Sequence, residues 1–167
     1  MTESASKRSA IRIAAIQAEG ASPFAQSYRD QFSTRPKVKA ETVATAIRIG
    51  DPASFDRAVG AIRFTDGVVT TVTDAEILDA KAVIDGAGVG CEPASAASVA
   101  GVRRLVREGT IRPTDRVVAL LTGHLLKDPG ALLRYHQELT PAPQYANPPI
   151  EIDPTLDAVQ RVIENGT

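Results

Sequence analysis

This chain of 167 residues has one cysteine, no tryptophan and almost no excess of charge of one sign. A single cysteine, Cys91, excludes an internal disulfide and a metal site built from several cysteines. Tryptophan is absent and aromatic residues make up 4% of the sequence, which argues against a platform on which nucleic-acid bases stack. The 19 basic and 20 acidic residues are well mixed, so no block of like charge indicates a nucleic-acid or anionic-membrane surface.

Long apolar runs are missing as well. No run approaches the roughly 18 residues that a membrane-spanning helix needs. Residues 1–10 are polar and contain no apolar core of a signal peptide. With 43% hydrophobic residues, the chain is long enough for one domain with a sizeable core, and we expect a cytoplasmic protein.

Short apolar runs alternate with segments of helical character from residue 11 onward. Strands are predicted at residues 11–17, 67–72 and 116–121, the last as a central parallel strand because it is apolar almost throughout. Residues 41–49 fit either a helix or a strand. The alternation predicts an α/β fold with parallel strands.

Helix boundaries are marked by caps, prolines and glycines. The predicted helices are residues 23–32, a helix after Gly50 with Asp51 as cap and Pro52 in its first turn, 74–84 behind a capping box of Thr73 and Glu76, and 93–108. The last of these has a stripe of small residues that includes Ala94, Ala97 and Gly101. Such a stripe predicts that another segment approaches this helix closely.

The chain is expected to divide into three parts. Residues 1–10 are predicted as a disordered lead-in, and residues 11–136 as the α/β domain. Residues 137–167 are predicted as a proline-rich extended tail with a short helix over 153–164.

Ligands in open α/β sheets bind at the carboxyl ends of strands, and three segments qualify. They are residues 17–20, the glycine-rich turn before Glu92, and residues 122–124. Each has an alternative without function: Gln17 and Glu19 as solvated residues, Glu92 as a charge at the positive end of a helix, and His124 as a packed or solvated histidine.

Other site types have little support in the sequence. The two histidines, His124 and His136, show no metal-ligand spacing, so no metal site is predicted. Neither a G-x-S-x-G elbow nor a phosphate-binding loop motif is present.

Three motifs in order carry a family resemblance. They are residues 41–54 (ETVATAIRIGDPAS), 92–98 (EPASAAS) and 121–129 (LTGHLLKDP), supported by weaker matches at residues 16–21 and 72–77. Together they resemble the carboxyl-terminal half of threonine synthases.

The resemblance implies a partial three-layer α/β/α parallel sheet of the fold type II, tryptophan synthase β-like enzymes that use pyridoxal phosphate. Such enzymes convert O-phospho-L-homoserine and water to L-threonine and phosphate. The implied cofactor-binding residues supply a hydroxyl at the pyridine nitrogen, line the side of the ring and form a wall behind it. They are Thr122, Gly123, Ala44, Thr45 and Glu92.

The departures from the family pattern are equally specific. The family's Schiff-base lysine lies in an SFKDR-like motif, and its phosphate-cradling loop lies upstream as well. None of the five lysines has that context, so no catalytic residue is assigned. Leu125 stands where the family usually has glycine. We therefore expect the isolated chain to be inactive and unable to retain pyridoxal phosphate stably, with a separate amino-terminal half or a second copy as partner.

Two alternatives remain. Another enzyme of the same fold, a threonine or serine dehydratase, is disfavoured because those enzymes typically show EPAGA and a serine-glycine-glycine-asparagine turn. A non-catalytic interaction module is the other alternative, since half a sheet would expose an edge and an apolar face.

Overall fold

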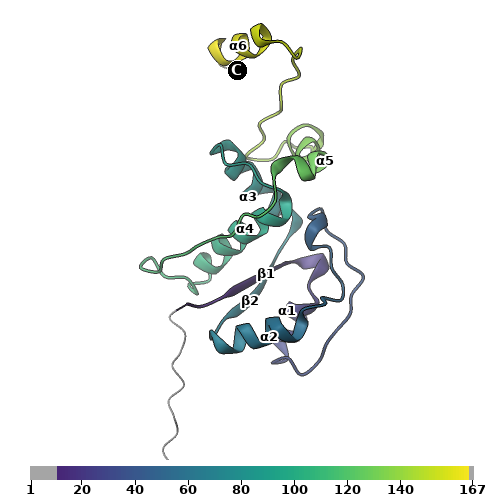
Figure 1. The fold of residues 1–167 in the computed structure, drawn as a ribbon, viewed down its shortest axis with the longest axis vertical. Coiled ribbons are helices and arrows are strands. Elements are labelled where there is room, and N and C mark those ends of the chain that lie inside the picture. The colour runs from purple at the N-terminus through teal and green to yellow at the C-terminus, as the bar shows by residue number, and fades with distance from the viewer. Residues whose placement is uncertain (1–10, 166–167) are drawn as a thin grey trace, which may run out of the picture.

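The computed structural model describes residues 11–165, so the predicted lead-in at 1–10 lies outside the described residues. Most of the helices gather around one small sheet (Figure 1). The elements in chain order are β1 (Ala14–Ala18), α1 (Pro23–Arg29), α2 (Phe55–Phe64), β2 (Val68–Val72), α3 (Asp74–Gly86), α4 (Pro93–Arg107), α5 (Pro129–Leu133) and α6 (Leu156–Asn165).

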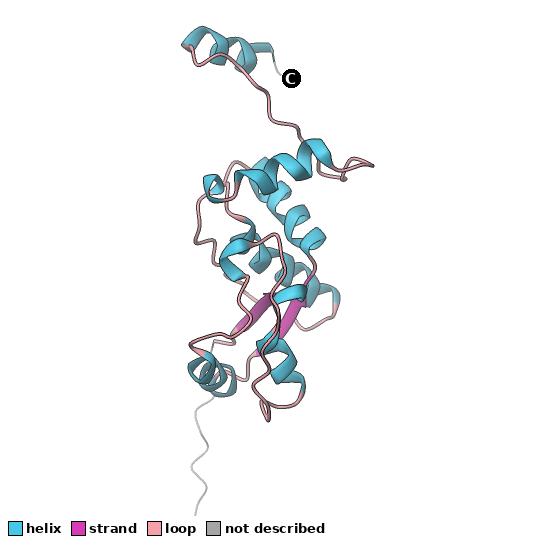
Figure 2. Cartoon of the chain, turned by 90° about the vertical axis from the view of Figure 1, so that its right-hand side faces the viewer, coloured by secondary structure: helices cyan, strands magenta, loops and turns pink. Residues whose placement is uncertain are grey.

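The two strands form a parallel sheet that carries a core on each face. Ala14 pairs with Val68 at one end of the register and Ala18 with Val72 at the other. Because side chains alternate along a strand, one face packs with Phe24, Phe55 and Ile62 of α1 and α2, and the opposite face packs with α3 and α4. The predicted α/β class and three-layer arrangement are confirmed, with a sheet of two strands (Figure 2).

The predicted helix after residue 73 begins with a complete capping box. The Thr73 hydroxyl accepts a hydrogen bond from the Glu76 N–H at 3.2 Å, and Glu76 Oε2 accepts one from the Thr73 N–H at 2.9 Å. The same carboxylate pairs with Arg104 and Arg107 of α4, each at 2.8 Å. Glu76 therefore fixes the start of α3 and ties α3 to α4.

The predicted stripe of small residues on α4 has its partner in β1. An ideal Cβ on Gly101 would lie 2.4 Å from Ile16 Cδ1 and 2.9 Å from Ile16 Cγ2. Since no real side chains approach so closely, only glycine lets α4 lie this near the strand. Ala96, Ala97 and the neighbouring Ala100 are almost completely buried in the same core.

The prediction of a central strand at residues 116–121 is wrong. This segment is extended but belongs to neither helix nor strand, and Val118 and Leu120 are 86% and 72% exposed. It runs beside α4, where the Ser98 hydroxyl donates to the Leu120 carbonyl at 3.2 Å. A strand requires a hydrogen-bonded neighbour, and in the described part of the chain β1 and β2 pair only with each other.

The predicted cap at Asp51 is also wrong. Helix α2 begins at Phe55, three residues later than Pro52, with Ser54 in the cap position. Asp51 instead pairs with Lys37 at 2.7 Å and Arg35 at 3.3 Å, and these two cations hold the pKa of its carboxyl group below the usual value. The carboxylate is drawn to full positive charges rather than to a helix end.

Other boundaries also differ from the predicted ones. Helix α1 ends at Arg29 rather than at residue 32, because Gln31 and Phe32 have left-handed backbones with φ of 59° and 62°. Residues 41–49 form an irregular segment with one 3-10 turn, Thr45–Ile47. Helix α3 continues to Gly86, two residues beyond the expected end.

The last helix stands apart from the rest of the described chain (Figures 1 and 2). Helix α6 contains no buried residue, and Leu156 and Ile163 are more than 70% exposed. Residues 139–155, which connect it to the domain, contain no helix or strand. Within residues 11–165, no helix is long and apolar enough to cross a bilayer.

The Glu76 cluster predicts a pH-dependent stability. Burial opposes ionisation of Glu76, but the Thr73 N–H and the two arginines outweigh it and lower its pKa below 4.5. A lowered native pKa stabilises the fold above the unfolded-state value, and that stabilisation is lost as the pH falls through the native value. Glu76→Gln should therefore cost about 1 kcal/mol of unfolding free energy at pH 7.

The measurement is urea unfolding of both proteins at neutral and acidic pH. The difference between them should shrink as the pH falls from about 5 to about 3. Glu164→Gln, an exposed change on α6, is the matched control and should leave stability unaltered. A Glu76→Gln difference that stays constant with pH would contradict the assigned role of the charge.

Candidate functional site

The start of helix α4 is where the predicted site residues meet. Glu92 occupies the cap position, and its backbone N–H donates to the Gly123 carbonyl at 3.0 Å. One helical turn into α4, the hydroxyl of Ser95 accepts hydrogen bonds from the N–H groups of Thr122 and Gly123, both at 3.0 Å. The segment at 122–123 is therefore held against α4 through its backbone.

The Glu92 carboxylate lies buried beneath this segment. Its side chain is 5% exposed and pairs with the Lys127 ammonium at 3.4 Å. An ideal Cβ on Gly123 would lie 1.8 Å from Glu92 Oε1, so the glycine leaves the space that the carboxylate fills. The side chain makes no capping hydrogen bond, and its position is thus not that of a solvated charge at a helix end.

Ala44 and Thr45 approach the same region from the irregular segment before α2. Ala44 is fully buried in the core that contains Ala96 and Ala97 of α4. Thr45 is exposed, and its hydroxyl donates to Asp128 Oδ2 at 2.7 Å. The structure thereby brings together all five predicted cofactor-binding residues, although they come from segments up to about 80 positions apart in the sequence.

The other residues singled out in the sequence have structural roles. Gln17 Oε1 accepts a hydrogen bond from the Ala25 N–H at 2.8 Å and so fixes the start of α1. His124 Nδ1 accepts one from the Leu126 N–H at 3.2 Å. Asp128 directly precedes α5, but its carboxylate binds Thr45 rather than capping the helix.

Leu125, which departs from the family pattern, is accommodated by a glycine elsewhere. An ideal Cβ on Gly90 would lie 2.7 Å from Leu125 Cδ2, and Gly90 has a φ of 65°. The larger side chain thus rests on a residue that has none.

Two residues near the site were missed by sequence reasoning. Ser95 lies within the EPASAAS motif, and nothing in the sequence distinguishes it from its neighbours. Its burial and its two N–H partners reveal its role. Lys81 is 2% exposed; its ammonium donates to Asp85 Oδ2 at 2.6 Å and to the Cys91 carbonyl at 2.7 Å. The spacing of Lys81 and Asp85, one helical turn apart, was the available signal.

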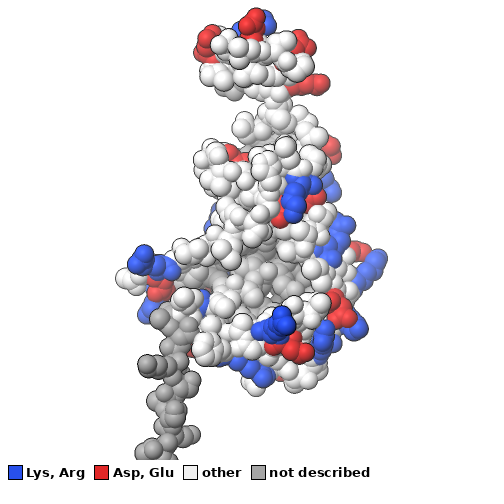
Figure 3. All heavy atoms as spheres, viewed as in Figure 1, with Lys and Arg blue, Asp and Glu red and all other residues white. Residues whose placement is uncertain are grey.

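The remaining polar groups offer little further chemistry. Burial raises the pKa of the Cys91 thiol, which keeps it protonated and unreactive near neutral pH. No group of three or more potential metal ligands occurs within residues 11–165. Acidic and basic side chains intermingle on the face shown in Figure 3, as the mixed charges of the sequence predict.

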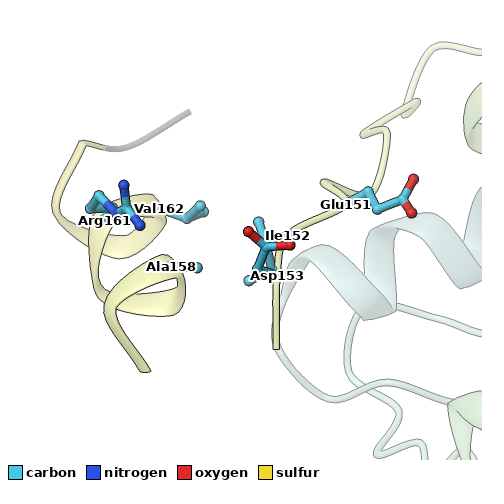
Figure 4. A pocket seen from close by; sticks show the side chains of 6 residues that line it. All are labelled: Glu151, Ile152, Asp153, Ala158, Arg161 and Val162. Atoms are coloured by element: carbon cyan, nitrogen blue, oxygen red, sulfur yellow. The ribbon is translucent and has the colours of Figure 1, made fainter. Parts of the chain in front are cut away.

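Two surface hollows lie away from these residues. One of about 450 Å³ is formed by Glu151, Ile152 and Asp153 of the tail together with Ala158, Arg161 and Val162 of α6 (Figure 4). Another of about 310 Å³ lies between α3, the region of His136 and residues 147–150. Neither includes any of the five predicted residues.

Comparison of the sequence with known proteins identifies a family. The family described as pyridoxal-phosphate dependent enzyme matches residues 1–123. The chain belongs to this family.

Its curated relatives include threonine synthases from several organisms. That of Methanosarcina acetivorans is 42% identical over 154 residues, which cover 91% of this chain and 36% of the relative. That of Methanocaldococcus jannaschii is 37% identical over 155 residues, with 92% and 36% covered, and that of Synechocystis sp. is 46% identical over 124 residues, with 74% and 30% covered. The chain thus spans about a third of the length of these relatives.

Among solved structures, the chain is similar to a crystal structure of a T.th. threonine deaminase, with a TM-score of 0.47 and 20% identity. The match covers 61% of this chain and 36% of the deaminase chain.

The chemistry of one exposed side chain beside the start of α4 fits the edge of a flat aromatic cofactor. Thr122 is exposed and carries a hydroxyl, which can pair with a ring nitrogen without placing a charge beside it. The space beside Gly123 is filled by the Glu92 carboxyl, and Ala96 and Ala97 of the EPASAAS segment are buried in the core, so these residues support the Thr122 segment from behind. Lys127, the lysine in this cluster, is engaged with Glu92.

The contact of Gly123 with Glu92 predicts a large effect of a small substitution. Gly123→Ala would force its methyl group into the Glu92 carboxyl, and we expect a loss of about 1–3 kcal/mol in unfolding free energy. Chemical denaturation measures the loss. Gly130→Ala in α5 is the control, because no atom lies within 4 Å of the new Cβ there. Equal stability of the two variants would contradict the packing of Glu92 beneath residue 123.

Proposed function

We propose that this chain forms the carboxyl-terminal part of the active site of a threonine synthase, which converts O-phospho-L-homoserine and water to L-threonine and phosphate. The observation that carries the proposal is the convergence of the three motif segments, 41–54, 92–98 and 121–129, at the start of α4. The names of the relatives that align with more than 90% of the chain support it.

Each residue of the cluster has a role in holding the cofactor. The Thr122 hydroxyl would donate to the ring nitrogen and keep it unprotonated, whereas a carboxylate there would hold a proton on that nitrogen. Ala44 and Thr45 would lie beside the ring, and Glu92 would fix the wall behind it from below Gly123. Pyridoxal phosphate itself supplies the electron sink for the reaction.

We infer that none of the described lysines supplies the amine that this chemistry needs. Lys37 pairs with Asp51 and Lys39 with Glu41. Lys81 is buried in its pair with Asp85, and Lys127 pairs with Glu92. Since covalent catalysis on this cofactor requires a lysine amine, we infer that the amine and the phosphate-binding loop come from residues outside this sequence.

The test compares the chain alone with the chain in the presence of the missing region. The purified chain is mixed with the part of the Methanosarcina acetivorans relative that precedes its match, together with pyridoxal phosphate and O-phosphohomoserine. We expect no threonine or phosphate from the chain alone and both products from the mixture. In the mixture Thr122→Val should lower kcat by about tenfold, which is the effect of losing one hydrogen bond. Thr114→Val, in an exposed turn, is the control and should not change kcat.

The contrary outcomes identify the alternatives. Threonine formation by the chain alone would show that its own lysines suffice and would refute the inferred incompleteness. Release of ammonia and a keto acid from threonine or serine would replace the synthase with a dehydratase. Tight association of the two parts without any turnover would favour an interaction module.

A further inference from the structure

The hydroxyl of Ser95 is the polar centre of the contact between α4 and the segment that follows residue 120. Ser95 is 3% exposed and lies one turn into α4. Its oxygen accepts hydrogen bonds from two successive backbone N–H groups, those of Thr122 and Gly123, each at 3.0 Å. The Thr122 hydroxyl oxygen lies 3.4 Å away, also within hydrogen-bond reach.

Counting hydrogens fixes the direction of these bonds. A serine hydroxyl has one hydrogen and two lone pairs. The two N–H donors occupy both lone pairs of Ser95, so its oxygen cannot also accept from Thr122. The remaining hydrogen must be donated, and the Thr122 hydroxyl oxygen is the acceptor within reach. A buried hydroxyl that leaves its hydrogen unused would carry a penalty of desolvation.

This direction determines what Thr122 can do. Once the Thr122 oxygen accepts from Ser95, its own hydrogen points away from that bond to α4, and Thr122 is an exposed residue. We propose that Ser95 is a positioning residue that sets the Thr122 hydroxyl as a hydrogen-bond donor toward the site. The inference rests on the proposed function for the identity of the acceptor, the ring nitrogen of pyridoxal phosphate.

Ser98, one turn further along α4, provides a control that distinguishes positioning of the Thr122 hydroxyl from simple attachment of its segment to the helix. Its single hydroxyl hydrogen is shared between the Ser95 carbonyl oxygen, 2.8 Å from Oγ, and the Leu120 carbonyl oxygen, 3.2 Å from Oγ. It therefore fastens the same segment to the same helix without touching Thr122. Ser98→Ala is the matched control for Ser95→Ala.

The first experiment needs only the full chain. Amide hydrogen exchange of Thr122 and Gly123 is measured by NMR in the original protein, Ser95→Ala and Ser98→Ala. We expect exchange at both positions to rise by about tenfold in Ser95→Ala and to change less than about threefold in Ser98→Ala. Unchanged exchange at both positions in Ser95→Ala would overturn the inference.

The second experiment uses the active mixture of this chain and the upstream region of the relative. It distinguishes a positioning role of Ser95 from a purely structural one. Ser95→Ala should lower kcat by about tenfold with KM for O-phosphohomoserine changed less than about twofold, and Ser95→Thr, which keeps the hydroxyl, should recover most of the loss. Because Ser95 acts through Thr122, the double variant Ser95→Ala/Thr122→Val should be no slower than Thr122→Val alone.

Three results would overturn the inference. If the losses of the two single variants multiply in the double variant, Ser95 acts independently of Thr122. If Ser95→Ala leaves kcat unchanged while Thr122→Val impairs it, Thr122 holds its orientation unaided, and the proposed function stands without Ser95. If Thr122→Val itself has no effect on kcat, the role of Thr122 in the proposed function fails, and the positioning role of Ser95 fails with it.

Discussion

The attachment of residues 120–123 to the start of helix α4 is the contact on which the candidate site depends. Two serine hydroxyls, the Glu92 N–H and a buried carboxylate hold a segment that has no partner strand in the described part of the chain. Hydrogen bonds to side chains thus replace the ladder that would usually fix such a segment in a sheet. Without them the Thr122 hydroxyl would have no fixed position relative to Ala44 and Thr45.

The second constraint is the close approach of segments to one another, which requires glycine at two points of contact. Gly101 lets α4 lie against Ile16 of β1, and Gly123 leaves space for the Glu92 carboxyl. Lys81 then holds the Cys91 carbonyl directly before Glu92, at the cost of burying an ammonium beside Asp85. The start of α4 is therefore positioned from the sheet, from α3 and from the segment after residue 120.

Features that depend on residues close together in the sequence could be predicted, whereas contacts between distant segments could not. The Thr73 and Glu76 capping box and the small stripe on α4 were predicted because each depends on residues a few positions apart. The strand at 116–121 was mispredicted because an apolar run becomes a strand only beside a neighbour. Asp51 was assigned to a helix end because Lys37 and Arg35, which bind it, lie about 15 positions away. Ser95 was overlooked because its two donors lie 27 and 28 positions downstream.

The central claim is that these residues form part of a cofactor site that other residues complete. Its most direct test is an absorbance spectrum of the purified chain incubated with pyridoxal phosphate and dialysed, with borohydride added only after the excess cofactor has been removed. We expect the cofactor to be removed completely from the chain alone and to be retained when the upstream region of a threonine synthase is present. A cofactor band that survives dialysis on the chain alone, and that mass spectrometry places on one of its own lysines, would contradict the account.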